Sequence, residues 1–188
     1  MDTTDEILDR YRRNADAFAD TVRAVPADRW GDPSPCPDWD ARAVVAHIVQ
    51  TQGLFETMVG RTIEPGPSVD DDPLAAFESA TSQVAAHLAD PQTAGAEYDG
   101  MFGRSTFARA VDQFLSGDLV IHRWDLGQAT GQAIRLPDDE VARYWHDSEV
   151  YGDRMRSPGA FGPAVEPPVD ADEQTRLLCF LGRRPPGA

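Results

Sequence analysis

Residues 105–131 read STFARAVDQFLSGDLVIHRWDLGQATG, and their apolar side chains recur every three or four positions. This spacing predicts one long helix, from Ser105 or Thr106 to about Thr130, with a stripe that faces a core. Gly131 follows as a natural C-terminal cap, because glycine readily adopts the left-handed conformation that ends many helices. The stripe consists of Val111, Leu115, Leu119, His122, Leu126 and Ala129.

The same helical spacing recurs on both sides of this segment. Before it we expect helices over about residues 4–25, from a cap at Asp38 or Asp40 to about 62, and over 72–89. After it we expect helices over about 137–152 and 170–182, separated by a Pro/Gly-rich C-terminal segment at 157–170. No stretch shows convincing strand alternation. The sequence therefore predicts an all-α fold, a four-helix bundle with extra short helices.

Length and composition limit the class of protein. We expect the 188 residues to form a single domain over residues 1–188, with a frayed tail at 183–188. The formal net charge of −15 argues against nucleic acids and anionic membranes as partners. The sequence contains neither a long apolar run nor a signal-peptide pattern, so we expect no membrane span and a cytoplasmic location. All 17 basic residues are arginine, which excludes catalysis by a lysine amine.

Asp118 and His122 are the polar anomaly of the long helix. They stand four positions apart, so both side chains leave the same face of the helix. A carboxylate beside a core-facing stripe is costly unless it is paired or binds a cation. An ordinary helix ion pair, or a core histidine with a hydrogen bond, would show the same spacing, so this pair alone does not establish a metal site.

His47 supplies a third candidate ligand, within the apolar run AVVAHIV of another predicted helix. A buried histidine is more often a core residue than a ligand, but polar groups on two helices of one bundle reinforce each other. His47, Asp118 and His122 form a two-histidine, one-carboxylate set, which leaves one coordination position open as in catalytic sites. Zinc is the first expectation, and the same ligands suit iron.

Three further residues are candidates for supporting roles at this site. Arg123 and Arg104 are candidates for binding a carboxylate of a substrate or thiol, since guanidinium groups match carboxylates. A solvent-facing position is the alternative for Arg123, which is rotated by about 100° from its neighbour His122. Asp125, three residues after His122, is a candidate to orient the histidine ring, with a surface salt bridge as the alternative.

The remaining chemistry-bearing residues receive structural interpretations. We interpret Trp39 and Trp124 as bundle core and Cys36 as a packing residue, and we expect both cysteines, Cys36 and Cys179, to stay reduced. The sequence offers no persuasive Ser-His-Asp or Cys-His set, so we assign no catalytic residue beyond the metal site.

Three stretches resemble one known family. They are SPCPDWDARAVVAHIV at 34–49, DLVIHRWDLGQATG at 118–131 and FGPAVEPPVDADEQTRLLCFLGR at 161–183. Together they resemble the metal-binding domain of mycothiol-dependent maleylpyruvate isomerase-type proteins, in the DinB-like superfamily. The resemblance covers nearly the whole chain in the same order.

The resemblance implies a DinB-like four-helix bundle in which His47, Asp118 and His122 hold a divalent metal, zinc first, with nickel or iron as alternatives. It implies that this metal binds the thiol of mycothiol, the small thiol of actinobacteria. The isomerase itself has glutamate where Asp118 stands and carries an additional C-terminal domain, for which the roughly 35 residues after the fifth predicted helix are too few. We therefore expect the metal and the thiol, but not maleylpyruvate as the substrate.

These observations leave three hypotheses about function. The first is a metal-dependent mycothiol S-transferase or thiol-dependent isomerase that acts on a small electrophile. The second is a metal-dependent hydrolase or lyase that uses metal-bound water on the same three residues. The third is a non-catalytic bundle that binds a small ligand or a partner. A homodimer is compatible with each, because helix bundles often share faces.

Overall fold

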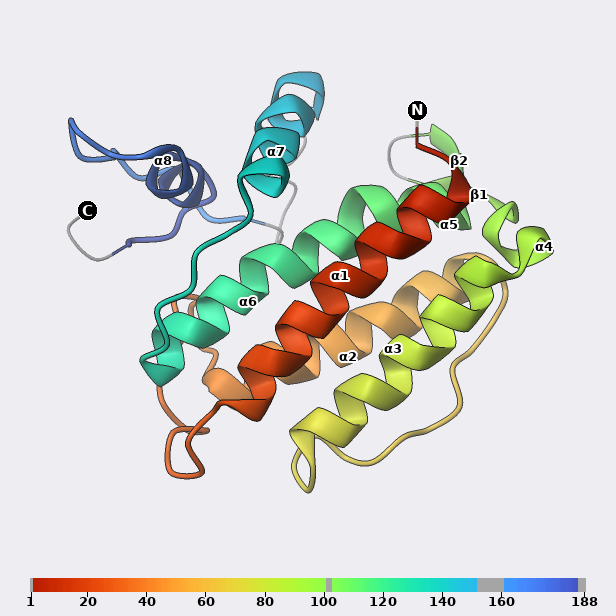
Figure 1. The fold of residues 1–188 in the computed structure, drawn as a ribbon, viewed down its shortest axis with the longest axis horizontal. Helices are drawn as coiled ribbons and strands as arrows, with labels where there is room; N and C mark the ends of the chain where they lie inside the picture. Colours follow the sequence, from red (N-terminus) through yellow and green to blue (C-terminus); the bar gives the residue numbers. More distant parts are fainter. Residues whose placement is uncertain (1, 101–102, 152–160, 186–188) are drawn as a thin grey trace. The chain divides into compact units, whose positions relative to one another are not determined.

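The computed structural model describes residues 2–100, 103–151 and 161–185 (Figure 1). The chain divides into two compact units, an N-terminal unit of residues 1–132 and a C-terminal unit of residues 133–188. The single domain expected over residues 1–188 stays a prediction.

Four long helical segments form the N-terminal unit. They are α1 (Thr4–Arg23), α2 (Ala41–Met58), α3 (Pro73–Ala89) and a composite segment made of α5 (Phe107–Ala110), a π-helix (Val111–Leu115) and α6 (Ser116–Thr130). Helix α1 packs against α3 and α6, and α2 packs against the same two helices (Figure 1). This arrangement confirms the expected all-α, DinB-like four-helix bundle.

Side chains at the helix ends explain where the helices begin and stop. Thr3 and Glu6 form a capping box at the start of α1, and Asp40 accepts from the backbone N–H of Ala43 at the start of α2. Gly131 ends α6 with φ of 76°, as the sequence predicts. Helix α2 ends at Met58, four residues earlier than expected, because Gly60 takes a left-handed conformation with φ of 71°.

The sequence missed four short elements of this unit. Helix α4 (Pro91–Ala94) follows α3, and strands β1 (Glu97–Gly100) and β2 (Gly103–Thr106) form an antiparallel hairpin before α5. The strands have four residues each, which is too short for an alternation of apolar and polar residues to stand out. The fourth is the π-helix, which the three-to-four spacing of the apolar stripe does not distinguish from an α-helix.

A buried ion pair ties the π-helix to α1. The Nη1 atom of Arg10 lies 2.8 Å from the Oδ1 atom of Asp112, and it also donates to the backbone carbonyl of Asp112. The side chains of Arg10 and Asp112 are only 8% and 11% exposed. The guanidinium therefore binds both the carboxylate and the backbone of a π-helical residue.

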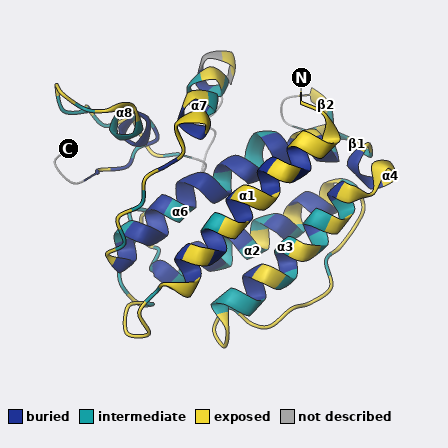
Figure 2. Cartoon of the chain, viewed as in Figure 1, coloured by how far each residue is buried: buried dark blue, intermediate teal, exposed yellow. Residues whose placement is uncertain are grey.

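The core of the N-terminal unit lies between the four helical segments, whose buried faces turn toward one another (Figure 2). Large side chains with no more than 1% exposure come from every segment: Tyr11, Phe18, Ile48, Phe77, Leu88, Phe107, Leu115, Leu119 and Leu126. The last three belong to the stripe that the sequence predicts. The stripe therefore fixes which face of α6 points inward.

The C-terminal unit contains α7 (Asp138–Tyr151) and α8 (Glu173–Phe180), which pack against each other. Both helices lie inside the ranges expected from the sequence. The backbone N–H of Val165, in the Pro/Gly-rich segment, donates to the carbonyl of Cys179 in α8. Arg183, expected in the frayed tail, is instead buried and donates to the carbonyl of Leu181. Residues 186–188 of that tail lie outside the described residues.

Within the described ranges, none of the helices has the length and apolar character needed to cross a membrane.

Candidate metal centre

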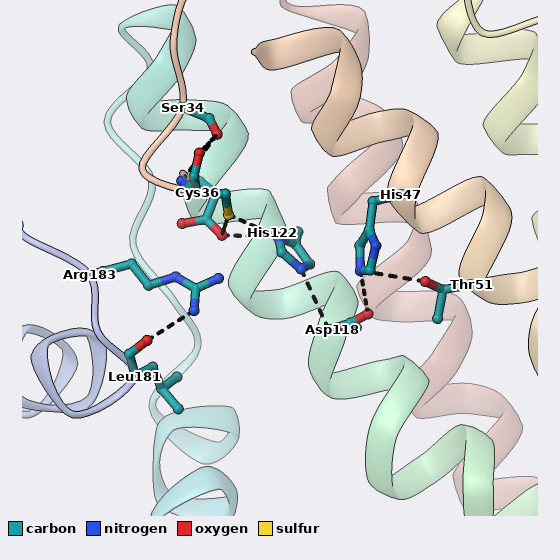
Figure 3. A network of polar contacts seen from close by, with 9 residues as sticks. Ser34, Cys36, His47, Thr51, Asp118, His122, Leu181 and Arg183 are labelled. Carbon is teal, nitrogen blue, oxygen red and sulfur yellow. Dashed lines mark hydrogen bonds and ion pairs between the residues drawn. The ribbon is translucent and has the colours of Figure 1, made fainter. Parts of the chain in front are cut away.

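The structure brings His47, Asp118 and His122 together at the contact between α2 and α6 (Figure 3). The Nε2 atom of His47 lies 3.1 Å from Oδ2 of Asp118, and Nε2 of His122 lies 3.6 Å from Oδ1 of the same carboxylate. The three candidate ligand atoms all lie within 4.8 Å of one another. We call these three residues the triad.

Helical periodicity places the triad at the edge of the core. On α2, Val44 and Ile48 are fully buried, which leaves their neighbour His47 at the margin of the buried face. On α6, the fully buried Leu119 does the same for Asp118. Because α2 packs against α6, the two margins meet and the polar side chains face each other.

Exposure to solvent changes across the triad. The side chains of His47 and Asp118 are 31% and 27% exposed, whereas that of His122 is 8% exposed. The solvent-exposed side of the triad is therefore the side of His47 and Asp118. On this side the hydroxyl oxygen of Thr51 lies 3.4 Å from Nε2 of His47.

The carboxylate of Asp125 contacts the second ring nitrogen of His122. Its Oδ2 atom lies 2.9 Å from Nδ1 of His122, and the Asp125 side chain is completely buried. The sequence predicts a contact at this place, and the orienting role of Asp125 stays a prediction. With Nδ1 directed at Asp125, the Nε2 atom of His122 is directed at Asp118.

The surrounding carboxylates stabilise the protonated form of His122. Burial alone would lower the pKa of this imidazole, but the negative charge of Asp118 and the hydrogen bond to Asp125 outweigh burial. The pKa of His122 rises to about 10. The two carboxylates therefore favour a positive charge at this position.

The sequence-based interpretation did not predict that Cys36 and Trp39 lie beside the triad and Asp125. Trp39 packs against the core as expected, but its ring centroid also lies 4.7 Å from that of His47 and 5.7 Å from that of His122. The Sγ atom of Cys36 lies 3.3 Å from Oδ2 of Asp125 and 3.9 Å from Nδ1 of His122. Both residues come from a loop, where helical spacing gives no signal; only their closeness to the cap of α2 could have pointed to them.

The two arginines predicted to bind a carboxylate are engaged elsewhere. The Nε atom of Arg123 donates to the hydroxyl of Thr21 on α1, at 3.2 Å. Arg104, on β2, forms an exposed ion pair with Glu97 on β1. Arg123 is directed at α1 because it follows His122 directly and so leaves a different face of α6. We therefore assign neither arginine to the triad.

Comparisons with known proteins add a family and relatives. The family described as "Mycothiol maleylpyruvate isomerase N-terminal domain" matches residues 11–127, a range that contains the whole triad. An uncharacterized protein of Mycobacterium tuberculosis (strain H37Rv) is 29% identical over 175 residues, which cover 92% of this chain and 95% of the relative. A second uncharacterized protein of that strain is 32% identical over 90 residues, which cover 42% of this chain and 34% of the relative. No solved structure matches the chain.

Proposed function

Because the chain belongs to the family of the mycothiol maleylpyruvate isomerase N-terminal domain, we propose that it is a metal-dependent enzyme that uses mycothiol. It transfers the thiol to a small electrophile, or isomerises the electrophile through addition and loss of the thiol. The observation that carries the proposal is the triad, in which one carboxylate lies between the Nε2 atoms of two imidazoles.

The donor set fits a divalent metal. Two imidazole nitrogens and one carboxylate oxygen suit zinc, and also nickel or iron. In the triad these atoms already face one another, and the raised pKa of His122 reflects a site that favours positive charge. Three protein ligands leave a coordination position for an outside molecule.

The chemistry that a divalent cation supplies when bound at such a site is deprotonation of a coordinated thiol, whose free form is mostly protonated at neutral pH. The chain's own residues orient and protect the site. Asp125 fixes the His122 ring, and the ring of Trp39 packs near both imidazoles and excludes water from that side. The partly exposed side of His47 and Asp118 is the entry for thiol and electrophile.

The first test of the proposal is metal content, measured by elemental mass spectrometry on untagged protein. We expect about one metal ion per chain in the wild type, and loss of the metal in His47→Ala and Asp118→Ala variants that keep their helical circular dichroism. Gln50→Ala, an exposed position on α2, is the matched control and should retain the metal. A folded wild-type protein that cannot be loaded with zinc, nickel or iron would contradict the proposal and favour a non-catalytic ligand-binding bundle.

The second test asks whether a thiol is consumed. The metal-loaded protein is incubated with an aryl halide, with and without mycothiol, and the thioether product is measured by mass spectrometry. Formation of the thioether that requires mycothiol, the metal and an intact Asp118 supports thiol transfer. Hydrolysis of ester or amide substrates without any thiol would favour the alternative, a hydrolase that uses metal-bound water.

The proposal extends to partners and location. We propose small-molecule partners and no nucleic acid, because a net charge of −15 repels phosphate backbones. We also propose a cytoplasmic location, where small thiols are kept reduced. Cys36 and Cys179 are free thiols in the structure, which is compatible with that compartment.

A further inference from the structure

The loop before α2 has a defined conformation. Pro33 and Asp40 pair as an antiparallel bridge, and the backbone N–H of Ser34 donates to the carbonyl of Trp39 at 2.8 Å. Trp39 in turn donates its backbone N–H to the carbonyl of Cys36. The Ser34 hydroxyl accepts from the backbone N–H of Cys36 at 3.1 Å. We call residues 33–40 the cap loop; its internal hydrogen bonds fix where the Cys36 side chain points.

The cap loop directs the Cys36 thiol at the Asp125 carboxylate that contacts His122. Figure 3 shows Cys36 and His122 close together. A single oxygen, Oδ2 of Asp125, lies 3.3 Å from Sγ of Cys36 and 2.9 Å from Nδ1 of His122. Asp125 is completely buried, whereas Cys36 is half-buried. A buried carboxylate depends on its donors for both its energy and its orientation.

From this shared oxygen we propose that Cys36 is a positioning residue of the metal centre, which acts through Asp125 to hold the His122 ring. The proposal rests on the function proposed above, because it concerns how firmly the triad binds its metal. In this proposal Cys36 is neither a metal ligand nor a nucleophile.

The effect of Cys36 is expected to be positional rather than electronic. A thiol is a weak donor, so it withdraws little charge from the carboxylate. Its removal leaves one oxygen of a buried carboxylate with less support, which lets Asp125 and then His122 leave their orientation. Outer partners of metal-binding histidines typically change metal affinity by about 10–100-fold. We expect Asp125→Asn to lower the zinc affinity by an amount in that range. Cys36→Ala should lower it by only about 3–10-fold, because the thiol acts one contact further from the metal.

A double-mutant cycle tests the proposal. The dissociation constant for zinc is measured by competition with a chromophoric chelator in Cys36→Ala, Asp125→Asn and the combined variant. If Cys36 acts through Asp125, the combined variant binds zinc no more weakly than Asp125→Asn alone. Cys36→Ser should stay within about twofold of wild type, because a hydroxyl can donate to the same oxygen. Cys179→Ala, which removes the buried thiol of α8, is the matched control and should leave the zinc affinity unchanged.

Several results would overturn the proposal. They are an unchanged affinity in Cys36→Ala, losses that multiply in the combined variant, or a folded Cys36→Ser that is as weak as Cys36→Ala. A sulfur-to-metal charge-transfer band in the cobalt-loaded wild type, absent from Cys36→Ser, would make Cys36 a ligand instead.

A measurement on the metal-free protein separates this proposal from the proposed function. The Nδ1 proton of His122, hydrogen-bonded to Asp125, is expected to give a downfield resonance that disappears in Asp125→Asn and shifts in Cys36→Ala. If the resonance responds in this way but the protein binds no metal, the proposed function fails and the contact between Cys36 and Asp125 stands. If metal binds and neither the resonance nor the affinity responds to Cys36→Ala, only the role of Cys36 fails.

Discussion

Asp118 is the residue on which the candidate site depends most, because one carboxylate serves both histidines. Its Oδ2 atom lies 3.1 Å from His47 and its Oδ1 atom 3.6 Å from His122. If this side chain becomes neutral, both imidazoles lose the negative charge beside Nε2, and only His122 keeps a second carboxylate partner, Asp125 at Nδ1.

We expect Asp118→Asn, which keeps the shape of the side chain, to weaken zinc binding by at least about 100-fold, because an amide is a much poorer metal ligand than a carboxylate. Asp118→Glu is the matched variant: it keeps the charge and adds one methylene, and should stay within about tenfold of wild type. Calorimetric titration of both variants with zinc checks this. Wild-type affinity in Asp118→Asn would remove the carboxylate from the ligand set.

His122 makes the metal-free protein sensitive to pH. Its pKa of about 10 in the folded state lies above the ordinary value of 6.5, so protonated His122 stabilises the fold. This stabilisation is complete below about pH 6.5 and is lost as the pH rises toward 10. The difference in unfolding free energy between the wild type and His122→Gln should therefore shrink over this range, by something on the order of a few kcal/mol. Urea unfolding of metal-free protein at several pH values measures it; a constant difference would contradict the pKa.

The triad and the contact between Asp125 and His122 could be predicted from the sequence, whereas the other surroundings of the triad could not. A spacing of four residues between Asp118 and His122 specifies their shared helix face without any tertiary information. The position of Cys36 depends on the turns of the cap loop, one of which places Asp38 at φ of 65°, and no periodicity describes such a path. The directions of Arg123 and Arg104 depend on the partners Thr21 and Glu97, which the sequence could not identify.

At the scale of the elements, the π-helix lies between α5 and α6, and the buried ion pair of Arg10 and Asp112 connects it to α1. The apolar stripe predicted one continuous helix from Ser105 or Thr106 to about Thr130, and the chain stays helical from Phe107 to Thr130. The local widening at Val111–Leu115 could not be predicted, because a step of four residues from Val111 to Leu115 suits an α-helix equally well. The pair of Arg10 and Asp112 depends on the approach of α1, which is a tertiary property.

We expect Arg10→Leu to reduce the free energy of unfolding by about 3–5 kcal/mol, because it leaves the Asp112 carboxylate buried without its cation. The double variant Arg10→Leu/Asp112→Leu should lose less, since both buried charges are gone. Urea unfolding followed by circular dichroism at 222 nm gives both values. A double variant that is less stable than Arg10→Leu would show that Asp112 has a stabilising role independent of Arg10.

For the molecule as a whole, the N-terminal unit contains everything that the proposed site requires. Residues 1–132 include all four helical segments, the triad, Asp125 and the cap loop. The side chain of Gln132 donates to the carbonyl of Thr21 and to the hydroxyl of Thr130, which ties down the end of this unit.

We expect a chain truncated after Gln132 to fold, with a helical circular dichroism spectrum and a cooperative thermal transition, because its core is complete without α7 and α8. Its zinc affinity should stay within about tenfold of that of the full chain, since all three ligands and Asp125 are retained. The same truncation with Asp118→Asn is the control. A truncated chain that stays unfolded would show that the two units depend on each other for stability, as a single domain does.

The contact between His47 and Asp118 joins residues 71 positions apart in the chain. A cation held there acts as a reversible cross-link that closes a long loop of polypeptide, as a disulfide would in an oxidising compartment. Fluctuations that separate α2 from α6 would first have to release the ion, so they become rarer as the site fills. Amide hydrogen exchange should then slow in α2 and α6 on addition of zinc and stay unchanged in α8. Occupation of the site by the metal would thereby reduce the local opening of the bundle between α2 and α6.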